Sequence, residues 1–120
     1  MPRPIHFEIV ATNPEKIVQF YSGLFGWEFS KWDGPQEYWL IRTGQGPGID
    51  GGMLRRREGS PNTVNTLDVP DIDDSIKRIE AAGGTTVVPK MPIPGVGHLA
   101  YCKDPEGTIF GIMQNDPSAA

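Results

Sequence analysis

Cysteine is nearly missing from this sequence: Cys102 is the only one among 120 residues. An internal disulfide is therefore excluded, and a reducing compartment is the simplest setting for the protein. Cys102 lies in the apolar-leaning segment LAYCKD. This context favours a packing role for the thiol over a nucleophilic one.

Long hydrophobic runs are also missing. No apolar segment approaches the roughly 20 residues that a membrane-spanning helix needs. The N-terminal stretch MPRPIHFEIV lacks the apolar core of a signal peptide. We therefore expect a cytoplasmic protein without a membrane partner.

Positive charge is not in excess, because 11 Lys and Arg residues face 15 Asp and Glu residues, for a net charge of −4. Nucleic acids and anionic membranes require a positive footprint, so we expect no nucleic-acid partner. The one basic run, Arg55-Arg56-Arg57, is either a solvated strand end or an anchor for a ligand carboxylate or phosphate.

Glycine (15) and proline (12) are abundant, which favours many turns and short strands. Alternating apolar residues predict eight strands. We place them within residues 5–12, 27–32, 37–43, 49–57, 63–69, 85–88, 95–103 and 108–114. The proline-rich segment 89–94 is expected to be an extended connector between two of these strands.

Two helices are predicted between these strands. The first begins with Asn13 as N-cap and Pro14 at the first helical position, and Gly26 ends it. Its expected half-buried stripe is Ile17, Phe20, Tyr21 and Leu24. The second helix follows Pro70-Asp71, presents Ile72, Ser75, Ile76 and Ile79 on one face, and ends at Gly83-Gly84.

The two halves of the chain repeat one order of elements: strand, helix, then three strands. Superposing Gly26-Trp27 on Gly84-Thr85 aligns the halves at an offset of about 58 residues. We predict an α+β domain over residues 1–120, built from two βαβββ modules at about 4–57 and 63–116. The modules would form a curved eight-stranded mixed sheet, with helices on the convex face and a cleft on the concave face.

Two glycine positions interrupt predicted strands. The pair Gly51-Gly52 indicates a bulge or a close backbone approach, and Gly111 leaves the last strand without a side chain in mid-alternation. Before that strand, Asp104-Pro105-Glu106-Gly107 has the composition of a type I turn.

The paired βαβββ pattern, the helix ending FYSGLFGWEF and the closing DPEGTIFGIMQ resemble the vicinal oxygen chelate superfamily. That superfamily includes glyoxalase I, bleomycin-resistance proteins and extradiol dioxygenases. The resemblance covers about residues 4–116, and MPIPGVGHLAYCKDPEGTIFGIMQ is similar to a branch of small glyoxalase-like proteins. The resemblance implies the fold. It does not imply one activity, because this superfamily hosts several chemistries.

The resemblance also implies four metal-ligand positions, on the first, fourth, fifth and eighth strands. Only His6 matches the expected ligand types. The other positions fall at Gly51-Gly52-Met53, at Val64 and at Gly111. One imidazole cannot hold a catalytic divalent ion alone. We therefore expect no family-type metal and no cofactor, and regard glyoxalase I activity as unlikely chemistry for this sequence.

Three functional hypotheses follow. The first is a homodimeric protein that binds a small organic ligand in an aromatic cleft, lined by His6, Glu8, Trp39, Met53, His98 and Met113. The second is a metal-dependent lyase, isomerase or dioxygenase with a displaced site, in which His6, Glu8, Asp68 and His98 converge. The third is a non-catalytic interaction module. Candidate catalytic groups are His6, Glu8 and His98.

Overall fold

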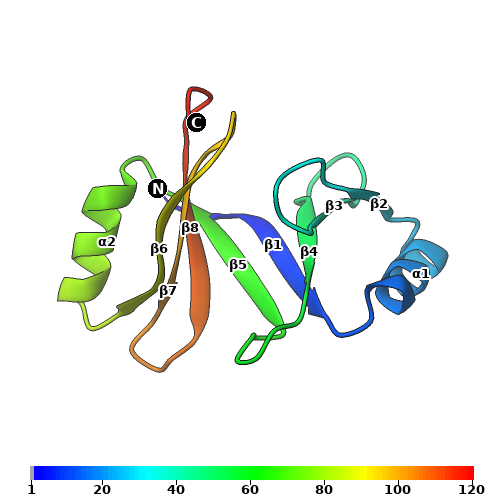
Figure 1. Ribbon diagram of the computed structural model, residues 1–120, viewed down its shortest axis with the longest axis horizontal. Helices are drawn as coiled ribbons and strands as arrows, with labels where there is room; N and C mark the ends of the chain where they lie inside the picture. Colours follow the sequence, from blue (N-terminus) through cyan, green and yellow to red (C-terminus); the bar gives the residue numbers. More distant parts are fainter. Residues whose placement is uncertain (1) are drawn as a thin grey trace. The chain divides into compact units, whose positions relative to one another are not determined.

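The computed structural model describes residues 2–120. It contains two helices and eight strands (Figure 1). The helices are α1 (Pro14–Phe25) and α2 (Ile72–Ala81). The strands are β1 (Pro4–Ala11), β2 (Glu28–Lys31), β3 (Trp39–Arg42), β4 (Gly51–Arg55), β5 (Thr63–Asp68), β6 (Thr85–Ile93), β7 (Gly97–Lys103) and β8 (Ile109–Asn115). Within residues 2–120, no helix is long and apolar enough to cross a membrane.

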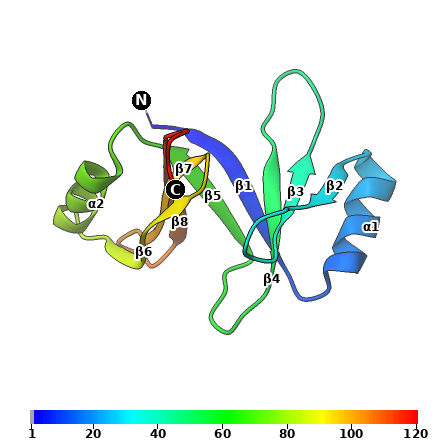
Figure 2. The same ribbon diagram turned by 45° about the horizontal axis from the view of Figure 1, so that its top comes forward.

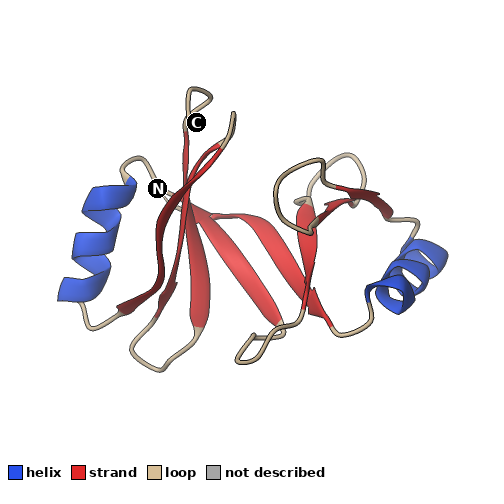
Figure 3. Ribbon diagram, in the orientation of Figure 1, coloured by secondary structure: helices blue, strands red, loops and turns tan. Residues whose placement is uncertain are grey.

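Hydrogen bonding orders the strands as β2-β3-β4-β1-β5-β8-β7-β6. Figure 3 draws the strands in red and the two helices in blue. The sheet is mixed, because β1 pairs parallel with β4 and β5 pairs parallel with β8, while β3–β4 and β7–β8 are antiparallel. The predicted α+β class with an eight-stranded mixed sheet is confirmed. The chain divides into two compact units: His6–Val64, and Asn65–Ala120 together with the segment that ends at Ile5.

Helix α1 begins and ends where the sequence predicts. The Asn13 side chain accepts a hydrogen bond from the backbone N–H of Lys16 at 3.3 Å, and Pro14 occupies the start of the helix. At the other end Gly26 adopts the left-handed conformation (φ 73°) and its N–H bonds to the Ser22 carbonyl. These are the capping interactions that polar N-caps and C-terminal glycines supply.

The apolar stripe predicted on α1 is only half right. Ile17 and Val18 pack against the buried cluster of the His6–Val64 unit, whose fully buried members are Ala11, Ile41 and Met53. Phe20 and Leu24, by contrast, are 53 % and 63 % exposed. The helix carries more apolar residues than one face can bury, so periodicity alone did not identify the buried face. Packing on the strands selects the face that contains Ile17 and Val18.

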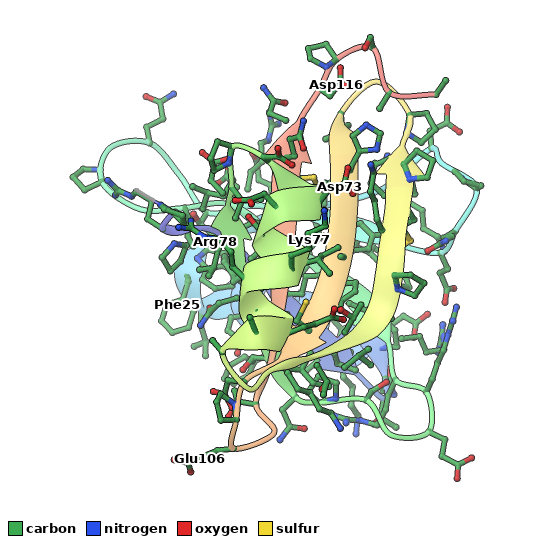
Figure 4. The ribbon with its side chains drawn as sticks, turned by 90° about the vertical axis from the view of Figure 1, so that its left-hand side faces the viewer. Phe25, Asp73, Lys77, Arg78, Glu106 and Asp116 are labelled. Atoms are coloured by element: carbon green, nitrogen blue, oxygen red, sulfur yellow. The ribbon has the colours of Figure 1, made fainter. Side chains whose placement is uncertain are left out.

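Helix α2 lies against β6, β7 and β8 in the second unit (Figure 4). Asp71 caps it by accepting from the backbone N–H of Asp74 at 3.1 Å. Lys77 and Arg78 are exposed on its outer side. The buried cluster beneath the helix comprises Val69, Ile72, Ala100, Cys102 and Ile112.

Most of the connector predicted at residues 89–94 belongs instead to strand β6, which includes its residues 89–93. This strand continues from Thr85 to Ile93 and pairs with β7, with irregular register between Thr86 and Val88 and between Val88 and Met91. Strand β6 is an edge of the sheet. An edge strand tolerates proline, because its outer N–H groups need no ladder partner.

The turn before β8 matches its prediction. The Gly107 N–H bonds to the Asp104 carbonyl at 2.9 Å, and the Asp104 carboxylate accepts from the N–H groups of Glu106 and Thr108. Gly107 has φ 89°, the left-handed region that favours glycine. The turn connects β7 to β8, and the two strands are antiparallel.

Candidate functional site

The side chains of strand β1 point alternately to two opposite faces of the His6–Val64 unit. Phe7, Ile9 and Ala11 contribute to the apolar cluster beneath α1. Successive side chains of a strand point to opposite faces, so His6 and Glu8 project from the other face. The candidate site is built on this second face.

His6 and Glu8 are joined there by Tyr38. The Nε2 atom of His6 lies 2.8 Å from the Tyr38 hydroxyl oxygen. That hydroxyl donates a hydrogen bond to Oε2 of Glu8, also at 2.8 Å. Glu8 is only 5 % exposed, so its carboxylate is held inside the protein by polar partners rather than by water. We refer to His6, Tyr38 and Glu8 as the polar triad.

Gly52 provides the space for the Tyr38 hydroxyl. Gly52 pairs with Glu8 across β1 and β4 and with Leu40 across β3 and β4. A Cβ atom built at Gly52 would lie 1.8 Å from the Tyr38 hydroxyl oxygen, far inside contact distance. The sequence predicted a bulge or a close backbone approach at Gly51-Gly52. The register with β1 is regular there, and the group that approaches Gly52 is a tyrosine hydroxyl.

Burial lowers the pKa of His6 below its ordinary value of 6.5, because the charged imidazolium is poorly solvated in this position. The negative charges of Glu8 and Asp50 act in the opposite direction but do not outweigh burial. The Asp50 carboxylate accepts hydrogen bonds from the Thr43 N–H at 3.0 Å and from the Thr43 hydroxyl at 3.2 Å. His6 is therefore neutral at pH 7, beside two carboxylates.

An aromatic ring adjoins the polar triad. Trp32 and Tyr38 meet edge to face, with ring centroids 6.1 Å apart and an interplanar angle of 78°. The Trp32 ring lies over Gly34, where a Cβ atom would come within 2.2 Å of it. The backbone N–H of Trp32 also bonds to the Tyr38 carbonyl at 2.7 Å, which fixes the two residues to one another. Polar groups and an indole thus occupy one region.

Between β3 and β4, residues Thr43 to Asp50 form a glycine-rich loop that extends away from the strands (Figure 2). Gly44, Gly46 and Gly48 all have positive φ. The loop surrounds a shallow polar cavity of about 250 Å³, lined by its own residues. Asp50 closes this loop, and its negative charge acts to raise the pKa of His6.

Trp39 and Met53 lie apart from the polar triad. Both belong to the apolar cluster beneath α1, where Met53 is completely buried and pairs with Ile9 and Trp39. Trp39 also carries the Lys31 ammonium 4.5 Å from its ring centroid. The alternation of β3 therefore places Trp39 in the core and Tyr38 in the site.

His98 and Met113 belong to the other unit and lie on opposite faces of its strands. His98 is in register with Gln114 and alternates with the buried Ala100, so it projects toward the α2 side. Its Nε2 lies 3.3 Å from an Asp116 carboxylate oxygen, and its Nδ1 is buried without a partner within residues 2–120. Met113 pairs with Leu99 and projects away from α2.

The basic run 55–57 has structural partners for its first two members. Arg55 forms an ion pair with Glu37 at 3.0 Å, which lowers the pKa of that carboxyl. Arg56 ties the linker before β5 to β1 by donating only to neutral acceptors. These acceptors are Thr12 Oγ1, the carbonyl oxygens of Val10, Ser60 and Pro61, and Asn62 Oδ1.

Sequence reasoning placed His6 and Glu8 on one face but missed Tyr38. A signal was present in the alternation of Tyr38, which directly precedes β3, with Leu40 and Arg42 of that strand, opposite to Trp39 and Ile41. The second signal was the absence of a side chain at Gly52, which left a space for a long polar side chain. Neither signal identifies the tyrosine without the register between β3 and β4.

The residues at the four expected ligand positions do not fit a divalent metal. His6 directs Nε2 at the Tyr38 hydroxyl, and the hydroxyl fills the volume above Gly52. Val64 is a buried apolar residue, and a Cβ at Gly111 would lie 2.9 Å from the Thr66 hydroxyl oxygen. Within residues 2–120, no group of three or more His, Cys, Asp or Glu side chains is arranged to hold a metal ion.

Comparison with known proteins shows which family has this architecture. The glyoxalase-like domain family matches residues 6–113, which is almost the whole chain. The chain belongs to this family. A solved superfamily member from Vibrio splendidus, described as glyoxalase/bleomycin resistance protein/dioxygenase, shares the fold with a TM-score of 0.65 at 17 % identity. The alignment covers 96 % of this chain and all of that one. The resemblance to the vicinal oxygen chelate superfamily is thereby confirmed.

Two curated relatives extend the comparison. The Mycobacterium tuberculosis protein named "Putative glyoxylase CFP32" is 28 % identical over 113 residues, covering 92 % of this chain and 43 % of the relative. The chain therefore spans less than half the length of that protein. The Vibrio parahaemolyticus protein named "Probable lactoylglutathione lyase" is 25 % identical over 130 residues, covering 98 % of this chain and 94 % of the relative.

Proposed function

We propose that this glyoxalase-like protein binds a small organic molecule at the polar triad, with the Trp32 ring as an apolar wall. The observation that carries the proposal is the hydrogen-bonded arrangement of His6, Tyr38 and Glu8. Few oriented polar groups beside an aromatic ring are the usual composition of a small-molecule site. The relative named as a lactoylglutathione lyase carries the name of an enzyme with a small organic substrate.

In this proposal the polar triad serves ligand binding, because packing of the protein does not require a carboxylate at position 8. Burying a carboxylate costs free energy unless hydrogen bonds compensate, and an apolar residue at position 8 would avoid that cost. The face beneath α1, by contrast, carries a cluster of apolar residues. Glu8 and Tyr38 thus form a preorganised polar surface that a ligand can use without reorganising the protein.

A thermal-shift screen tests the proposal. A ligand that binds only the native state at 100 times its Kd raises the free energy of unfolding by about 2.7 kcal/mol. We expect a saturable increase in melting temperature with at least one member of a panel of aromatic and polar organic compounds. The increase should be lost in Tyr38→Phe, which keeps the ring and removes the hydroxyl.

Tyr21→Phe is the matched control. Tyr21 lies in α1, outside the triad, and its ring stacks on that of Trp27 with the centroids 4.7 Å apart. Ligand binding should survive this substitution. The proposal is wrong if no compound in a broad panel shifts the melting temperature. It is also wrong if a ligand's shift is the same in Tyr38→Phe as in the parent protein.

A further inference from the structure

The hydrogen-bond directions within the polar triad fix the proton on His6. A tyrosine has one hydroxyl proton, and Tyr38 donates it to the carboxylate of Glu8. The Tyr38 oxygen can then only accept from His6, so Nε2 of His6 must be the protonated nitrogen. A neutral imidazole carries one N–H. The lone pair of His6 therefore resides on Nδ1.

Nδ1 is the unused group of the triad. Within residues 2–120, none of the hydrogen bonds of His6 involves this atom. His6 is partly rather than fully buried. The atom thus offers an oriented acceptor, held in position by Tyr38 and Glu8 through the opposite nitrogen.

The charges around His6 determine which ligand group suits this acceptor. Glu8 and Asp50 are both close enough to influence His6 electrostatically. The cations Lys31 and Arg55 are paired with Glu37, and neither is among the charges that shift the pKa of His6. A carboxylate or phosphate placed at Nδ1 would meet an atom that cannot donate, beside two negative charges.

We infer that the protein recognises its ligand through a hydrogen-bond donor, neutral or cationic, received by Nδ1 of His6, and that it discriminates against anionic groups at this position. The inference rests on the proposed function and specifies its ligand class. Hydroxyl, amide N–H and ammonium groups meet the requirement. His6, Tyr38 and Asp50 are then the residues that determine specificity.

The first experiment concerns the ligand-free protein. The chain has two histidines, so ¹⁵N NMR can resolve both imidazoles and His98→Asn assigns them. We expect a proton on Nε2 of His6 and a bare Nδ1 near neutral pH, with this preference weakened in Tyr38→Phe. A proton on Nδ1 of His6, or a tautomer ratio unaffected by Tyr38→Phe, would overturn the inference.

The second experiment uses three probes of matched shape: benzyl alcohol, benzylamine and sodium benzoate. Binding is followed by the His6 signals at pH 7. We expect benzyl alcohol or benzylamine to bind at least about tenfold more tightly than benzoate, a ratio that one unfavourable charge contact can produce. Equal or tighter binding of benzoate at His6 overturns the inference, and so does the absence of any His6 response to all three probes.

Asp50→Asn tests the charge directly, because the amide keeps the shape and an acceptor oxygen for Thr43. It should narrow the preference for benzylamine over benzoate and leave benzyl alcohol binding nearly unchanged. Glu58→Gln removes the same charge from an exposed linker position and serves as control. If a ligand that depends on Tyr38 proves to be anionic at His6, the inference fails while the proposed function stands.

Discussion

Tyr38 and Gly52 form a complementary pair at the scale of single residues. The Tyr38 hydroxyl occupies the volume that a side chain at Gly52, the second residue of β4, would need. This exclusion couples a residue that precedes β3 to a glycine on a neighbouring strand. The site therefore depends on the absence of atoms at position 52 as much as on the presence of Tyr38.

Substituting Gly52→Ala should displace Tyr38 and break the polar triad. Overpacking of this kind costs about 1–3 kcal/mol of unfolding free energy. Urea denaturation measures the loss, and the intrinsic fluorescence of Trp32 beside Tyr38 should change with it. Gly23→Ala is the control, because Gly23 lies within α1 with no atom near its Cβ position. That change should stabilise the protein by roughly 0.5–1 kcal/mol, and a Gly52→Ala protein as stable as Gly23→Ala would contradict the prediction.

The lowered pKa of His6 predicts a pH dependence of stability. Well above pH 6.5, His6 is neutral in both the folded and the unfolded chain, so it contributes no pH dependence there. As the pH falls below 6.5 toward the folded-state pKa, the unfolded chain takes up the proton more readily. The free energy of unfolding should therefore decrease over this window.

Chemical denaturation of the parent protein and of His6→Gln, measured between about pH 7.5 and pH 5, checks this dependence. The parent should lose more stability than the variant as the pH falls. A parent protein that gained stability relative to His6→Gln on acidification would show that His6 is protonated more easily in the folded state.

Cys102 should behave as a packing residue. It is fully buried in the cluster beneath α2, and burial raises the pKa of its thiol, although a hydrogen bond with Thr86 acts in the opposite direction. The thiolate is the reactive form. We expect Ellman's reagent to modify native Cys102 at least about 100-fold more slowly than the urea-unfolded chain. Rapid labelling of the native protein would contradict this.

At the scale of elements, the helix caps could be predicted from the local sequence, whereas the packing of the elements could not. Asn13 and Asp71 cap their helices as their residue types predict, because capping is local. The buried stripe of α1 and the extent of β6 depended on neighbouring strands. Helix α2 adds a contact that sequence spacing does not reveal: the Gln114 side chain of β8 accepts from the Ile72 N–H at 2.9 Å.

Gln114→Ala should destabilise the protein by about 1–3 kcal/mol, because Ile72 is fully buried and its N–H would lose its partner. Gln114→Glu keeps an acceptor at the N-terminal end of the helix, where negative charge is favourable. It should lose less stability than the alanine variant in the same urea titration. Equal losses would show that the side chain acts through packing rather than through this hydrogen bond.

At the scale of the whole molecule, the family fold is present, but the positions other than His6 where the resemblance implies metal ligands lack the expected donor types. Tyr38 above Gly52 and Thr66 beside Gly111 fill two of the positions where ligands were expected. This is the reason why family membership alone does not assign an activity here.

Metal removal should therefore leave the protein unchanged. We expect dialysis against EDTA, followed by addition of Ni²⁺, Zn²⁺, Fe²⁺ or Mn²⁺, to shift the melting temperature by less than about 1 °C, since a metal that binds the native state would stabilise it by mass action. Elemental analysis of the purified protein should find no stoichiometric divalent ion. A stoichiometric metal whose loss lowers the melting temperature, and which His6→Gln fails to retain, would contradict the prediction.

The sequence by itself determined the element order, the helix caps, the Asp104 turn and the placement of His6 and Glu8 on one face of β1. These features depend on residue type and on spacing within one segment. Only the tertiary structure decided that Tyr38 joins them and that Trp39 and Met53 do not. The physical reason is strand register: one residue's shift along β3 exchanges Tyr38 for Trp39 between core and site, and only pairing with β4 sets that register.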